Sequence, residues 1–73
     1  MPRPISLNIV IKTLKNKDFF FVSQRGSHAK FRKHTNPVRT VIVKTGKKEI
    51  PYGTFRSILS MSGLSEKDFR KMR

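Results

Sequence analysis

Residues 19–33 read FFFVSQRGSHAKFRK, and this stretch decides the fold. Residues 19–24 begin aromatic and β-branched and end polar, which predicts a strand, and residues 28–33 predict a second one. Gly26 and Ser27 between them form a tight turn, so the two strands are expected to pair as an antiparallel hairpin. The three consecutive phenylalanines predict that both faces of the first strand are covered where it begins.

The second strand of this hairpin has two unlike faces, because side chains alternate sides along a strand. Ala29 and Phe31 are expected to face a core. The other face carries the polar residues His28, Lys30, Arg32 and His34. A histidine beside fixed cations suits chemistry on a phosphate group, although a solvated strand face has the same composition.

The segment before the hairpin is predicted to form a helix that covers the sheet, and the segment after it is predicted to add the third strand. Apolar residues at spacings of three, four and seven predict a helix over residues 6–16, with Ser6 as its N-cap. Residues 35–37 carry a turn signal, and residues 39–44 predict the third strand. Residues 46–53 are expected to form a basic loop.

The last part of the chain is predicted to be helical. Thr54 is the expected N-cap of a helix that ends before Gly63, and Gly63 suits the left-handed position that terminates helices. Ser65 and Asp68 resemble a capping box that starts a final turn or short helix. Its apolar contacts are expected from Leu64, Phe69 and Met72. The element order α-β-β-β-α-α predicts an α+β fold, a three-stranded antiparallel sheet with helices on one face.

Composition limits the protein class. The 73 residues allow one domain, spanning 1–73, and the chain has no cysteine, which excludes disulfides and thiolate zinc sites and fits a cytoplasmic protein. Nothing is long or apolar enough to span a membrane or to act as a signal peptide. Seventeen Lys and Arg residues against four acidic ones give a formal charge of +13, which points to a nucleic acid. An acidic protein and an anionic membrane surface are the alternatives.

His28 is the candidate catalytic residue. An imidazole can take a proton from a ribose 2′-hydroxyl or give one to a leaving oxygen, and Lys30 or Arg32 could stabilise the extra negative charge. Gly26 would let a backbone approach closely. The alternative is an ordinary solvated histidine in a hairpin. His34 shares the face but would lie about 20 Å from His28 along an ideal strand, so the two are not expected to act on one phosphate.

Three lysines lie at the end of the third strand and in the loop after it, and phosphate contact is a hypothesis for them that a solvated loop matches equally well: Lys44, Lys47 and Lys48. The six phenylalanines could stack on bases, but their spacing makes core packing the default for most of them. No pair of acidic residues has a clear metal-ligand spacing on one element, and no phosphate-cradling glycine loop or dinucleotide fingerprint is present. We therefore expect neither a metal nor a cofactor.

Taken together, these residues resemble the HicA toxins, the small RNA-cleaving partners of HicB antitoxins. The resemblance covers nearly the whole chain: an N-terminal helix, Phe20 to Gln24, Gly26-Ser27-His28, Lys48-Glu49, Gly53 to Leu59, and Gly63-Leu64-Ser65. The glycine-serine-histidine turn is a short motif by itself. The turn motif becomes a specific signal when it is combined, at this separation along the chain, with the sequence Gly-Thr-x-Arg-x-Ile-Leu of residues 53–59.

The resemblance implies a fold like the double-stranded-RNA-binding domain, a ribonuclease acting on mRNA without a metal, and an antitoxin that covers the site. It assigns catalysis to His28 and its presentation to Gly26 and Ser27. Relatives carry Pro and His near the end of the third strand, where this chain has Val43 and Thr45, and threonine cannot replace histidine as a proton carrier. We therefore expect a single essential histidine, with a non-catalytic RNA-binding module as the alternative function.

Overall fold

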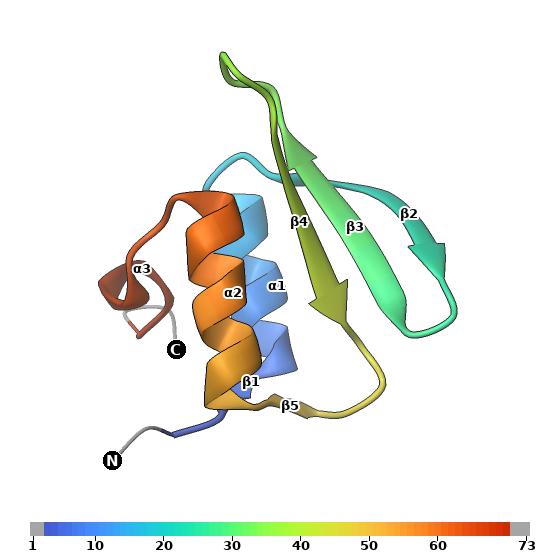
Figure 1. Ribbon diagram of the computed structural model, residues 1–73, viewed down its shortest axis with the longest axis vertical. Coiled ribbons are helices and arrows are strands. Elements are labelled where there is room, and N and C mark those ends of the chain that lie inside the picture. Colours follow the sequence, from blue (N-terminus) through green and yellow to red (C-terminus); the bar gives the residue numbers. More distant parts are fainter. Residues whose placement is uncertain (1–2, 71–73) are drawn as a thin grey trace.

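The computed structural model describes residues 3–70, which form two layers (Figure 1). The elements in chain order are β1 (Ile5–Ser6), α1 (Leu7–Asn16), β2 (Phe20–Arg25), β3 (His28–Lys33), β4 (Arg39–Lys44), β5 (Glu49–Ile50), α2 (Tyr52–Ser62) and α3 (Glu66–Arg70). This confirms the α+β class and the expected order of helices and main strands, an arrangement consistent with the double-stranded-RNA-binding-domain fold. The two-residue strands β1 and β5 were not predicted.

The main sheet has the order β2-β3-β4, and both of its neighbouring pairs are antiparallel. The predicted hairpin is confirmed, because Arg25 pairs with His28 across a turn of two residues. Gly26 has a φ of 56°, whereas Ser27 does not have a positive φ. A positive φ at only the first turn position is the requirement of a type II′ turn, and it explains the glycine there.

One irregularity changes which side chains of β2 face which way. The pairing register shifts between Phe21 and Ser23, so Val22 is the extra residue of a β-bulge. Phe21 lies opposite Phe31, but Ser23 lies opposite Lys30, on the other face of the sheet. The bulge therefore reverses the alternation between the two halves of β2.

The core lies between the sheet and the two longer helices, which pack on the same face (Figure 1). Ala29 and Phe31 are buried, as the alternation along β3 predicted. The full set of buried apolar side chains is Ile5, Val10, Leu14, Phe19, Ala29, Phe31, Val41, Val43, Ile50, Phe55, Ile58 and Phe69. Four of the six phenylalanines are thus core residues, in agreement with the sequence analysis.

The start of β2 differs from expectation. Phe19 is buried, but Phe20 and Phe21 are 43% and 51% exposed, so the prediction that both faces are covered here is wrong. The reason lies in the layer arrangement, since β2 is an edge strand that diverges from the helices in Figure 1. Neither layer supplies enough cover to bury both rings.

Both long helices begin differently from the predicted caps. Ser6 occupies the N-cap of α1, but among the described residues its side chain makes no capping hydrogen bond; the Leu7 N–H donates instead to the Lys48 carbonyl at 2.8 Å. The second helix starts at Tyr52, with Pro51 at its N-cap, so the assignment of that role to Thr54 is wrong. Extended backbone at Pro51 and the burial of Ile50 before it fix this earlier start.

The predicted end of α2 is confirmed, because Gly63 has a φ of 74° and donates its N–H to the Leu59 carbonyl at 2.9 Å. Before α3, the Asp68 carboxylate accepts hydrogen bonds from the Ser65 N–H and hydroxyl at 3.0 and 3.1 Å. This is the half of a capping box in which the third helical residue reaches back. Phe69 is buried against Phe55, whereas the expected contact of Met72 lies outside the described residues.

Candidate functional site

His28 is the first residue of β3 and lies between two cations. Its direct neighbours across the sheet are Arg25 on β2 and Lys44 on β4. Residues directly opposite one another in antiparallel strands share a face, with Cβ atoms about 5 Å apart. Together with Lys30, two residues further along β3, these side chains form what we call the histidine cluster: Arg25, His28, Lys30 and Lys44.

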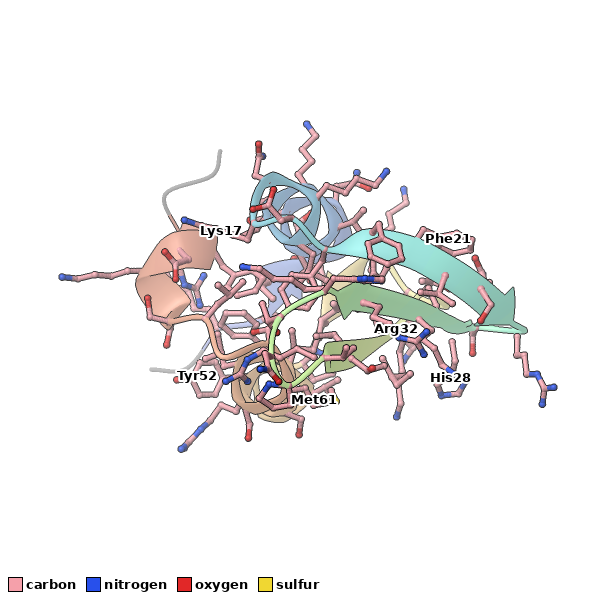
Figure 2. All side chains as sticks on the ribbon, turned by 90° about the horizontal axis from the view of Figure 1, so that it is seen from above. Lys17, Phe21, His28, Arg32, Tyr52 and Met61 are labelled. Carbon is pink, nitrogen blue, oxygen red and sulfur yellow. The ribbon has the colours of Figure 1, made fainter. Side chains whose placement is uncertain are left out.

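The surface at this cluster is concave. A hollow of about 560 Å³ is lined by Ser23, Arg25, His28, Lys30 and Ile42. His28 is exposed, so its ring is accessible to a large substrate. Lys30 therefore lies where the sequence analysis expected it, beside His28. Arg32 is on the same side of the sheet, as Figure 2 shows, but it does not line this hollow.

Hydrogen bonds attach the turn that carries His28 to the ends of both neighbouring strands. The Thr45 N–H donates to the Ser27 carbonyl at 2.6 Å. The Gln24 amide nitrogen donates to the Gly26 carbonyl at 3.0 Å and to the Thr45 hydroxyl at 3.3 Å. These bonds connect the end of β2, the turn and the end of β4, so they fix the turn relative to both neighbouring strands.

The backbone of the predicted turn explains the glycine at position 26. A Cβ added at Gly26 would meet nothing within 4 Å, so a close approach of another part of the chain does not require glycine there. The positive φ requires it instead. Ser27 contacts the following loop, since a Cβ on Gly46 would lie 3.4 Å from that of Ser27.

The structure divides the three candidate lysines. Lys44 and Lys47 line one hollow of about 340 Å³ that also includes Ser27 and Thr54. Lys48 does not line it. Its carbonyl accepts the Leu7 N–H, and it borders hollows on the side of β1 and the start of α1. Lys44, a member of the histidine cluster, thus shares one hollow with Lys47, and Lys47 shares another with Lys48.

The acidic residues lie mostly away from this cationic surface. Asp68 and Glu66 belong to the α3 region, where they pair with Lys17 at 3.5 Å and Arg70 at 3.1 Å. Hydrogen bonds from Ser65, assisted by Lys17, hold the pKa of Asp68 below its usual range. Only Glu49 borders the hollow at the basic loop. Over residues 3–70, no ion pair neutralises a member of the histidine cluster.

No group of three or more histidine, aspartate or glutamate side chains within residues 3–70 is placed to hold a metal ion. In the same range, every helix is too short or too polar to cross a membrane.

Residues 8–64 match the family model described as HicA toxin of bacterial toxin-antitoxin, well over half of the chain. This protein belongs to the HicA toxin family. A search of curated proteins gives no significant match. Family membership confirms the resemblance seen in the sequence, and it makes the chain a toxin of a toxin–antitoxin system.

The HicA match extends from α1 to Leu64 and so contains the histidine cluster, the turn and the basic loop. Sequence reasoning missed three contributors within this region: Arg25 as a neighbour of His28, and Gln24 and Thr45 as holders of the turn. The signal for Arg25 was present, because a two-residue turn pairs the residues on either side of it. The bond between Gln24 and Thr45 joins residues 21 positions apart and leaves no local pattern.

Proposed function

We propose that this HicA family toxin, as one domain spanning residues 1–73, is an endoribonuclease that cleaves mRNA in the cytoplasm and thereby inhibits translation and growth. The observation that carries the proposal is the placement of His28 between Arg25 and Lys44 on an exposed, concave sheet face. Simple affinity for RNA requires cations but not a proton-transfer group held between them on a fixed turn.

The chemistry follows from the groups present. His28 acts as the general base that removes the proton of a ribose 2′-hydroxyl, and the resulting oxygen attacks the adjacent phosphorus. Arg25, Lys30 and Lys44 stabilise the additional negative charge on the phosphoryl oxygens. The bond to the 5′-oxygen breaks, and that oxygen takes a proton from water. The products are a 2′,3′-cyclic phosphate and a 5′-hydroxyl, and no step calls on a metal.

The remaining candidate residues have supporting roles in this proposal. Gly26 and Ser27 present the histidine, while Arg32, Lys47 and Lys48 contact phosphates further along the RNA. Phosphate contacts of this kind add affinity without sequence choice. A HicB-like antitoxin is the proposed protein partner and neutralises the toxin by covering the histidine cluster.

The test is cleavage of labelled single-stranded RNA in EDTA by the protein and by His28→Ala, with RNA affinity measured for both. We expect the variant to lose at least about 100-fold in rate while its affinity stays within a few-fold. Arg25→Ala should lower the rate more than Lys67→Ala, which removes one positive charge from an exposed position on α3. Binding without cleavage by either protein would favour the RNA-binding module, and 5′-phosphate products would exclude the proposed route.

A further inference from the structure

An exposed aromatic pair lies on the same sheet face as His28. Phe20 is directly opposite Arg32 in the register, which puts it on the outer, polar face. Its ring packs against the His34 ring, with centroids 5.0 Å apart and planes tilted by 48°. Phe20 nevertheless remains 43% exposed. A large apolar ring thus lies uncovered on a face whose charged strand residues are cations.

Core packing does not account for this ring. The neighbouring Phe21 is on the other face, where it makes an edge contact with the buried Phe31 at 5.9 Å between centroids. Figure 2 shows Phe21 on the opposite side of the sheet from Arg32 and His28. Phe20 has no such contact with a core residue, and its ring partner, His34, is itself exposed.

We propose that Phe20 and His34 form a stacking platform for an unpaired base of single-stranded RNA, with the RNA backbone passing Arg32 and Lys30 to reach His28. The inference rests on the proposed function and adds the class of substrate. Aromatic rings beside a cationic track are the combination that binds single strands, because every base has a face that can stack. A base within a duplex cannot reach such a ring, so the substrate has to be single-stranded at this position.

The geometry also places the stacked base relative to the cleaved bond. Arg32 is four residues from His28, which corresponds to about 13 Å along the strand. The base on the platform therefore belongs to a different nucleotide from the one whose 2′-hydroxyl reacts. The charge pattern suits the phosphates of RNA, since Arg25, Lys30, Arg32 and Lys44 share this face and none is paired with an acid among the described residues.

The first experiment measures binding of a 2′-O-methyl single-stranded RNA, which 2′-hydroxyl attack cannot cleave, by fluorescence anisotropy. Phe20→Ala should weaken binding roughly 5- to 100-fold, and Phe20→Trp should restore it. Phe21→Ala is the matched control, because the two residues are adjacent and similarly exposed but lie on opposite faces. A duplex of the same sequence should bind Phe20→Ala and the unaltered protein equally.

The second experiment uses the unaltered protein with 2-aminopurine at successive positions of the RNA, so it does not depend on the folding of a variant. Stacking on the platform should change the fluorescence strongly at one position. A uniform response along the RNA, or equal affinities for Phe20→Ala and the unaltered protein, would overturn the proposal. If Phe20→Ala loses affinity only for the antitoxin, the surface binds that protein and not RNA, and this result would also overturn the proposal.

These outcomes separate the platform from the nuclease. If Phe20→Ala weakens binding of the uncleavable RNA and no form of the protein cleaves ordinary RNA, the platform stands and the nuclease proposal fails. If the unaltered protein and Phe20→Ala cleave and bind alike, the nuclease stands and the platform fails.

Discussion

Replacing Gln24 with alanine tests whether the turn that carries His28 has to be held in place. The substitution removes two hydrogen bonds, one to the Gly26 carbonyl at 3.0 Å and a longer one to the Thr45 hydroxyl at 3.3 Å. The Thr45 N–H still bonds to the Ser27 carbonyl, so the turn keeps one attachment. We therefore expect a folded protein whose histidine is less firmly positioned.

The size of the effect follows from those two bonds. Both are exposed, and an exposed hydrogen bond contributes at the low end of the usual range, about 0.5 kcal/mol. Their joint loss of about 1 kcal/mol lowers the ratio of ordered to disordered turn about fivefold, since 1.4 kcal/mol corresponds to a factor of ten. Gln24→Ala should thus reduce the cleavage rate at saturating RNA by up to about fivefold, while its affinity for the uncleavable RNA stays unchanged.

Two companion variants make the test specific. Gln24→Glu has the same size but cannot donate to either acceptor, so it should be no more active than Gln24→Ala. Thr45→Val removes only the longer bond and should lower the rate about twofold. A Gln24→Ala protein with an undiminished rate, or one whose RNA affinity falls in step with its rate, would refute a positioning role for this residue.

Three further predictions concern the scaffold. The Thr13 hydroxyl is buried and has no hydrogen-bond partner within residues 3–70, so Thr13→Val should raise stability by about 1 kcal/mol, seen as a melting temperature roughly 4–8 °C higher. Gly63→Ala should lower the free energy of unfolding by about 1–2 kcal/mol in a denaturant titration, because the backbone at this position is left-handed. Adding Arg39→Ala removes the contact between the new methyl group and the flexible arginine, so it should restore little of that loss. The lowered pKa of Asp68 contributes stability that is complete above the unfolded-state value near 4 and is lost as the pH falls through the folded value. Melting curves of Asp68→Asn should accordingly show a shallower loss of stability over this acidic range; an unaltered acid limb would contradict the assignment.

Local sequence patterns were sufficient to predict the main helices and strands and the residues at the centre of the candidate site. The two-residue turn at Gly26 defines the hairpin, and strict alternation along β3 places His28 and Lys30 on one face. Lys44 was named for its charge, and only the register of β4 makes it a direct neighbour of His28.

The features that sequence reasoning missed depend on contacts between distant segments. The bulge at Val22 reverses the facing of β2, so alternation counted from Phe20 would place Arg25 on the wrong side of the sheet. The exposure of Phe21 depends on how far the helices extend over an edge strand, which no periodicity records. The strands β1 and β5 have two residues each, too few to show a period.

The pairing of β1 with β5 has a consequence for how the toxin is made. Ile5 pairs with Ile50, and both side chains are buried in the core. Translation proceeds from the N-terminus at about 5–20 residues per second, so Ile5 waits roughly 2–9 seconds before its partner exists. The core cannot close before then, and α2, which completes it, follows later still. The scaffold behind His28 is therefore completed only after the ribosome has synthesised α2, well after His28 itself has been made.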